Sequence, residues 1–182
     1  MSDVKALIAW LLGVPQDVPV EQCGATAAFA AISGHDVYAV MRWRGPRDLT
    51  PRERRLLRST GTAIGHERSG ALYAGDVPAA ATTAVLLPQR LPAAVRATLG
   101  IGPDGEALPE IARVPLGRAL TGLGARRECL GVVPTPGVRD ADGHELVIRS
   151  VARLWLDSPI AIVTERVYGQ FLDAFPVDGV RQ

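Results

Sequence analysis

The chain has 182 residues, of which 47% are hydrophobic and 21% are charged, and this composition is typical of a globular protein rather than a disordered or fibrous one. Its 20 Lys and Arg residues against 19 Asp and Glu residues give a formal net charge of +1, which supplies no general attraction for nucleic acid or for an anionic membrane. The length predicts a single domain over residues 1–182.

The N-terminal quarter predicts two helical or ambiguous stretches followed by a strand. Apolar residues at helical spacing over residues 4–12 predict a short amphipathic helix, and the prolines of residues 14–22 predict an irregular loop. The Ala-rich stretch over residues 25–32 is compatible with more than one secondary structure. Residues 37–43 alternate in the manner of a strand.

A capping box marks the next helix. Thr50, Pro51 and Glu53 combine an N-cap hydroxyl, a proline at the first helical position and a reciprocal glutamate, so a helix is expected through about Arg58. We interpret its arginine-rich surface as a solvated face, because the rest of the chain has no basic excess that would favour nucleic acid. The arginines are Arg52, Arg54, Arg55 and Arg58.

A hairpin is expected in the middle of the chain. Residues 71–74 and 80–87 have strand-like composition, and they flank Gly75 and Asp76, which are turn-forming residues. A short helix over residues 92–99 follows. These elements predict local antiparallel pairing rather than a parallel crossover.

The C-terminal half predicts another short helix and three long strands. The helix runs from Pro115 to Leu123, and the strands cover residues 127–133, 145–156 and 160–167. The turns between these strands are too short for parallel crossovers. We therefore expect an α+β fold in which an antiparallel sheet of about six strands carries helices on one face.

The cysteines and histidines of the chain indicate neither a metal site nor a catalytic triad. Cys23 and Cys129 form no C-x-x-C pattern, so free thiols are expected. His35, His66 and His144 have no helical or strand spacing to one another, so each is expected to be exposed or structurally satisfied. The absence of an export signal and of a long apolar run predicts a cytoplasmic protein with no membrane partner.

Two charged residues in predicted strands are candidates for a site. Arg68 precedes the first strand of the hairpin, and Glu165 interrupts an apolar run that begins at Ile160. A carboxylate in such a run lies either at a sheet edge or in a polar cavity, and the pattern alone leaves both options open.

The order of several motifs resembles the chorismate pyruvate-lyase family in its compact bacterial branch, with a chorismate-lyase/UTRA-like fold. Residues 114–120 resemble its P-L-G-R-x-L turn, and residues 159–165 resemble its terminal strand, which ends in T-E. Residues 68–78 are similar to its arginine-led hairpin, residues 149–156 to its penultimate strand, and residues 7–12 to its first helix.

The resemblance implies a cofactor-independent lyase that cleaves chorismate into 4-hydroxybenzoate and pyruvate inside an internal cavity. It implies that Arg68 holds the ring carboxylate and that Glu165 lies at the hydroxyl end, both as catalytic and substrate-binding residues. Leu116 and Gly117 in the P-L-G-R turn would contact the ligand. A guanidinium grips a carboxylate bidentately, and a buried carboxylate can move a proton, so these residue types suit the chemistry.

One segment departs from the family pattern and keeps other hypotheses open. Residues 14–22 replace the Ser/Thr-rich flap that covers the ligand, and Asp17 lies near its usual basic position. The same fold could therefore serve another carboxylate-bearing or more apolar substrate in a biosynthetic pathway. A third hypothesis is a non-catalytic effector sensor, although such regulators carry a winged-helix segment before this domain. All three involve a small-molecule partner, with the protein a monomer or a homodimer.

Overall fold

The computed structural model describes residues 24–108 and 113–176, which form a six-stranded antiparallel sheet of order β1-β2-β3-β6-β5-β4. The strands are β1 (Val37–Asp48), β2 (Ile64–Ala74), β3 (Val77–Leu86), β4 (Arg126–Arg139), β5 (Glu145–Trp155) and β6 (Pro159–Tyr168). The helices are α2 (Ala25–Ser33), α3 (Pro51–Leu56), η2 (Pro88–Arg90), α4 (Ala93–Thr98), α5 (Leu116–Ala119) and α6 (Gly169–Ala174). The expected α+β class with an antiparallel sheet is confirmed.

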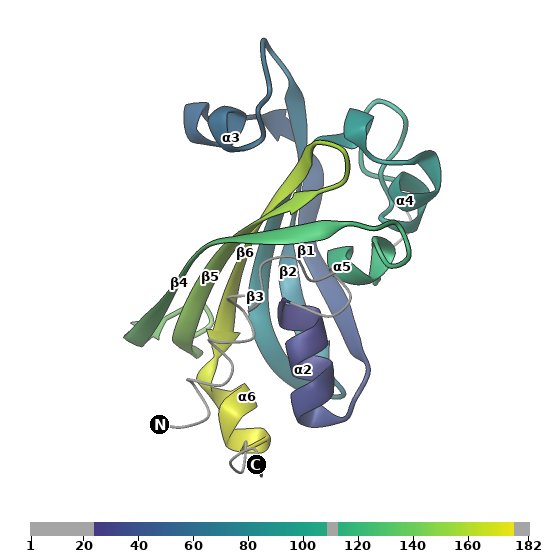
Figure 1. Ribbon diagram of the computed structural model, residues 1–182. Coiled ribbons are helices and arrows are strands. Elements are labelled where there is room, and N and C mark those ends of the chain that lie inside the picture. The colour runs from purple at the N-terminus through teal and green to yellow at the C-terminus, as the bar shows by residue number, and fades with distance from the viewer. Residues whose placement is uncertain (1–23, 109–112, 177–182) are drawn as a thin grey trace.

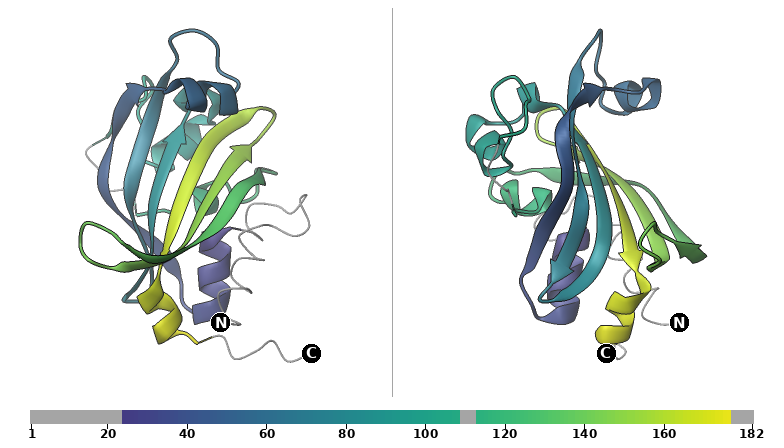
Figure 2. Two further views of the ribbon diagram at one scale, coloured as in Figure 1. Left: turned by 90° about the vertical axis from the view of Figure 1, so that its left-hand side faces the viewer. Right: turned by 180° about the vertical axis from the view of Figure 1, so that it is seen from behind.

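The sheet is strongly twisted, and most helices lie on one of its faces (Figures 1 and 2). Helices α2, α4 and α5 occupy the same side in Figure 1, whereas α3 lies on the other side near one end of the strands. The alternation of side chains explains this arrangement, because Ala84 and Val163 belong to the core under α4 and α5, while their neighbours Val85 and Ile162 pack against Leu57, just after α3. The expectation of helices on one face thus holds for α2, α4 and α5 but not for α3.

The Ala-rich stretch that was ambiguous in the sequence is helix α2. It ends at Gly34, which adopts the left-handed conformation with φ of 69° and donates its N–H to the carbonyl of Ala30. Tertiary packing supports the helix, since the fully buried ring of Phe29 meets the ring of Phe171 in α6 with centroids 4.7 Å apart. Helix α6 was not expected from the sequence.

The predicted capping box is present at the start of α3. The Thr50 hydroxyl accepts the N–H of Glu53, and the Glu53 carboxylate accepts the N–H of Thr50. The hydrogen bond from Arg47 lowers the pKa of Glu53 to about 2. Helix α3 has no buried residue of its own, in agreement with the solvated face inferred from its arginines.

The C-terminal strands lie where they were expected, and β4 is longer than predicted. It continues past Val133 to Arg139, and its register with β5 shifts between Pro134 and Val138. Prolines cannot donate to a ladder, and they are tolerated at edge strands and bulges, which is where β4 carries them. The strand predicted from the sequence therefore ended too early, at Val133, just before the first proline of β4.

Two hydrophobic clusters cover the face that carries α2, α4 and α5. One joins α2 and α6 to the sheet around Phe29 and Phe171, and the other joins α4 and α5 to the sheet around Leu120 and Ile160. A cavity lies between the two clusters, because its lining takes residues from both.

Three expectations fall outside the described residues. These are the helix over residues 4–12, the loop over residues 14–22 and the thiol of Cys23. Cys129 is a free, half-buried thiol. Within residues 24–108 and 113–176, no helix has the length and apolar character needed to cross a bilayer.

The substitution Phe29→Ala tests the contact between α2 and α6. Removal of this fully buried ring should lower the free energy of unfolding by about 3–5 kcal/mol, because it removes transfer energy and leaves a cavity. Urea unfolding measures the loss. Val133→Ala, at a position 51% exposed, is the control and should change stability by less than about 0.5 kcal/mol. Equal effects of the two substitutions would contradict the packing described here.

Candidate functional site

The cavity between α2, α5 and the sheet has a volume of about 250 Å³. Its lining is mostly apolar and includes five charged side chains. The apolar lining includes Ala39, Met41, Leu72, Ala84, Leu116, Leu154 and Val163. The charged lining residues are Asp36, Arg68, Arg118, Arg127 and Glu165. An apolar chamber with a few convergent polar groups is the usual form of a small-molecule site.

All four residues selected from the sequence line this cavity. Arg68 comes from β2, Glu165 from β6, and Leu116 and Gly117 from the start of α5. Arg68 and Glu165 are only 3% and 7% exposed, so both charges are buried. Their roles toward a ligand remain proposals.

Glu165 lines the cavity, and it lies on β6, an inner strand of the sheet. It lies between β3 and β5, where Thr82 and Ser150 are the register partners of Glu165 on either side. Directly opposed residues point to the same face of a sheet, and Thr82 also lines the cavity. Of the two options that the sequence left open, the polar cavity is therefore the one observed, and the sheet edge is not.

The Glu165 carboxylate is held by two donors that the sequence did not reveal. The Arg127 guanidinium donates through Nη2 to Oε2 at 3.1 Å, and the Ser150 hydroxyl donates to the same oxygen at 2.5 Å. Ser150 is fully buried and Arg127 is 6% exposed. The alternation of β5 places Ser150 among inward-facing apolar residues, and this polar residue in a buried position is the one sequence feature that marks it.

Arg68 has a different environment from Arg127. Its Nη2 donates to the carbonyl oxygen of Val114 at 3.2 Å, and its buried Nε has no acceptor. Burial, together with the nearby positive charge of Arg44, lowers the pKa of Arg68 to about 10. Among the residues that the structure describes, no carboxylate pairs with Arg68, so Glu165 and Arg68 share a cavity without forming an ion pair.

The first turn of α2 also lines the cavity, through residues 24–27. The N-terminus of a helix carries partial positive charge and outward-pointing N–H groups. A Cβ atom added to Gly24 would lie 3.0 Å from Nε of Arg127, so the helix begins directly against this guanidinium. The cavity thus combines two buried arginines, Arg68 and Arg127, and a helix N-terminus with one buried glutamate.

His66 lies two residues before Arg68 on the same strand face. It is fully buried, and its Nδ1 lies 2.6 Å from the carbonyl oxygen of Gly105, whereas its Nε2 is buried without a hydrogen-bond partner among the described residues. The ring is therefore neither exposed nor fully satisfied, unlike the expectation from the sequence. Burial lowers the pKa of His66, with smaller contributions of the same sign from Arg68 and Arg44. In the described part of the chain, no group of three His, Cys, Asp or Glu residues is arranged to hold a metal ion.

Solved structures with a similar fold include a bacterial effector domain. The effector domain of PhnF from Mycobacterium smegmatis matches with a TM-score of 0.50 and 15% identity, over 80% of this chain and 88% of that one. PhnF itself matches with a TM-score of 0.52 and 15% identity, over 81% of this chain and 64% of that one, so the match spans less than two thirds of PhnF. A GntR-family transcriptional regulator from Bacillus cereus matches with a TM-score of 0.48 and 8% identity, over 80% and 99% of the two chains.

No protein-family model matches the chain, and the search of curated proteins finds no match either. At 15% identity, the likeness to PhnF shows that the chain has the fold of that effector domain. The UTRA-like part of the expected fold agrees with this result.

The expectation of a chorismate-cleaving enzyme is wrong. The matching structures are PhnF and its effector domain rather than lyases, and this finding overturns the assignment of chorismate as substrate and of 4-hydroxybenzoate and pyruvate as products. The physical reason is that one fold hosts unrelated functions, so motifs that build a shared cavity do not identify its chemistry. No catalytic role is therefore assigned to Arg68 or Glu165.

The substitution Glu165→Gln tests the buried ion pair. It removes the charge that faces Arg127 at nearly constant shape, and it should lower the free energy of unfolding by about 3 kcal/mol, because the buried guanidinium of Arg127 loses a charged acceptor. The control is Glu128→Gln, which weakens the ion pair between Arg153 and a glutamate 45% exposed and should cost less than about 1 kcal/mol. Chemical denaturation compares the two. Equal costs would contradict the buried pair.

The lowered pKa of His66 predicts a specific dependence of stability on pH. In the folded protein the ring stays neutral below the unfolded pKa of about 6.5, because the folded pKa is lower. The contribution of His66 to the free energy of unfolding is therefore complete above that pH, and it is lost as the pH falls toward the folded pKa, by up to about 1.4 kcal/mol per pH unit. Urea unfolding at pH 7.5, 6.5 and 5.5 should show this loss. It should shrink in His66→Gln and persist in His35→Gln, where the residue is exposed. An unchanged pH profile in His66→Gln would refute the assignment.

Proposed function

We propose that residues 1–182 act as one non-catalytic domain that binds a small molecule with an anionic end, in the manner of an effector domain. The observation that carries the proposal is Arg68, a guanidinium 3% exposed that faces the cavity without a carboxylate partner among the described residues. A buried charge without a counter-ion is unfavourable, and an anionic ligand would supply the counter-ion.

The rest of the cavity supports a ligand with an apolar body. Besides Arg68 and Glu165, the wall contains several aliphatic side chains, among them Leu116 at the start of α5. A volume of about 250 Å³ suits a compact ring or a short chain. Burial of such a body would supply a non-directional share of the binding free energy.

The end of the cavity near Glu165 favours a polar group on the ligand. Arg127 and Ser150 both donate to Oε2 of Glu165, and Thr82 lies beside it on β3. A hydroxyl group could exchange hydrogen bonds with this set, since carboxylate and hydroxyl oxygens accept while guanidinium and hydroxyl groups donate. Arg68 on one side and the group of Glu165, Arg127 and Ser150 on the other would orient the ligand. Gly117 of α5 forms part of the same cavity wall.

The fold gives further support to an effector role. The chain has the fold of a domain of PhnF whose solved structure is described as an effector domain. We infer that the present chain uses its cavity to hold a small molecule and release it unchanged.

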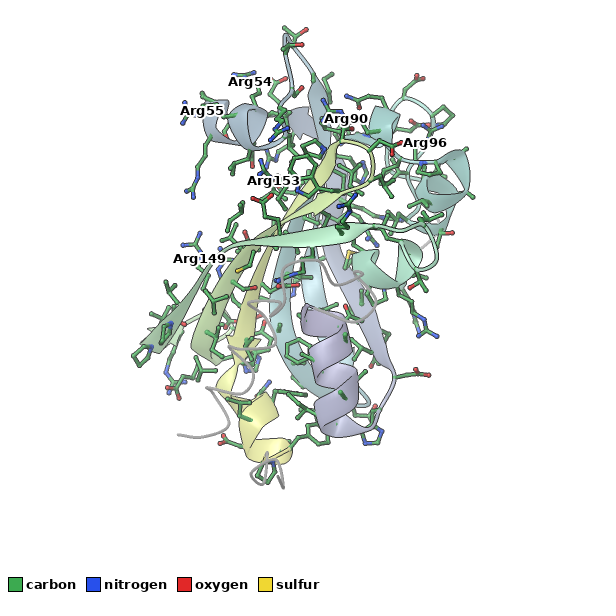
Figure 3. All side chains as sticks on the ribbon, in the orientation of Figure 1. Arg54, Arg55, Arg90, Arg96, Arg149 and Arg153 are labelled. Carbon is green, nitrogen blue, oxygen red and sulfur yellow. The ribbon has the colours of Figure 1, made fainter. Side chains whose placement is uncertain are left out.

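Benzoate and benzamide form a matched pair of probes for the anionic end. Benzoate should bind, as followed by calorimetry or ligand-observed NMR, and neutral benzamide should bind at least about tenfold more weakly. Arg68→Met should weaken benzoate binding by about tenfold or more, because it removes the guanidinium but keeps an apolar side chain. The control Arg149→Met changes an arginine that extends from the opposite side of the sheet (Figure 3) and should leave binding unchanged.

Recovery of the probe completes this experiment. After prolonged incubation, benzoate should be recovered chemically intact by chromatography. Equal affinity for benzoate and benzamide, or normal benzoate binding by Arg68→Met, would refute the proposed role of Arg68.

A further inference from the structure

A second arginine lies directly opposite Arg68. Arg44 on β1 is the register partner of Arg68 on β2. Directly opposed residues of an antiparallel pair have Cβ atoms about 4.5–5.5 Å apart and point to the same face. Two guanidinium groups therefore stand side by side on the face of the sheet that carries the cavity, with Arg68 in the cavity wall and Arg44 next to it.

Neither of these two arginines has a carboxylate partner within the described ranges. Arg44 donates through Nη2 to the carbonyl oxygen of Leu108 at 2.6 Å, and Arg68 donates to that of Val114. One further nitrogen of each, Nη1 of Arg44 and Nε of Arg68, is buried and has no acceptor. Arg47, close by on β1, pairs with both Glu53 and Glu67.

The neighbouring groups do not remove this excess charge. His66 is held neutral near physiological pH, because burial lowers its pKa. Glu106 lies close enough to His66 to affect that pKa, but Glu106 is exposed and its carboxylate accepts the N–H of Asp104. Solvent screens an exposed carboxylate, whereas Arg68 is almost completely buried. The wall around Arg44 and Arg68 is therefore doubly positive and poorly compensated.

We propose that the cavity selects a ligand whose end group carries two negative charges, such as a phosphate monoester, and that Arg44 determines this preference. The proposal rests on the proposed function, since it names the class of anion held at Arg68. Arg44 acts over a short distance through its charge, while Arg68 makes the direct contact. A second negative charge about 7 Å from a guanidinium, at an effective dielectric constant of about 20, gains enough energy to raise affinity more than tenfold.

Phenyl phosphate and phenyl sulfate test the preference, because they have the same shape but differ in charge. At pH 7.5 phenyl phosphate is almost fully dianionic, since its second pKa is about 6, and phenyl sulfate is monoanionic. Calorimetry should show that the wild-type protein binds phenyl phosphate at least about tenfold more tightly than phenyl sulfate.

Variants of Arg44 identify the source of the preference. Arg44→Gln should reduce the affinity ratio to below about threefold, and Arg44→Lys should keep most of it, because lysine restores the charge. Arg42→Gln, at an arginine two residues earlier on β1 whose side chain is 60% exposed, is the control and should keep the wild-type ratio. Circular dichroism and thermal unfolding establish that each variant is folded.

The outcomes separate this inference from the proposed function. Benzoate binding together with equal affinity for phenyl phosphate and phenyl sulfate would overturn the dianion preference and leave the anion site intact. An unchanged ratio in folded Arg44→Gln would overturn the role of Arg44. If benzoate, phenyl phosphate and phenyl sulfate all fail to bind the wild-type protein, the proposed function falls and this inference falls with it.

Discussion

Unequal pairing of buried charges is the constraint on which the site depends. The cavity face of the sheet holds Arg68 and Arg127, and the carboxylate of Glu165 pairs with Arg127. Ser150 donates to the same carboxylate oxygen, so this charge pair is held within the protein. Arg68 has no such partner among the described residues, and Arg44 beside it adds charge of the same sign. The fold thus keeps a positive charge inside an apolar chamber, which is unfavourable without a counter-ion.

The antiparallel sheet makes this arrangement possible because it brings distant residues into register. Glu165 and Ser150 are opposite each other on β6 and β5, and Arg44 and Arg68 are opposite each other on β1 and β2. Helices α2 and α5 then close over this face, so the first turn of α2 adds partial positive charge to the same chamber. The Arg127–Glu165 pair and the Arg44–Arg68 pair are therefore two separate charge environments. Their separation comes from the order in which the strands pair, not from distance along the chain.

Much of the fold was predictable because its signals are local. The capping box at Thr50, the turn at Gly75 and the three C-terminal strands each depend on neighbouring residues. The charges of Arg68 and Glu165 marked both as candidates, but the pattern left a sheet edge and a polar cavity open for Glu165, and only the family resemblance placed both residues in a cavity. Arg44, Arg127 and Ser150 were missed, because their relation to the site comes from pairing between strands. Register is a tertiary property, and no pattern within a single strand encodes it.

The error about activity has the same origin. The turn at Pro115 and Leu116 begins α5, and the run that ends at Glu165 forms the central strand, so both motifs describe how a cavity wall is built. A wall of this kind serves an enzyme and a sensor equally well. What distinguishes ligands is the charge left uncompensated after the wall has formed, and here that charge is set by Arg44 as well as Arg68. The charge that a ligand meets in the cavity therefore depends on side-chain pairing across strands, which motifs within a single strand do not encode.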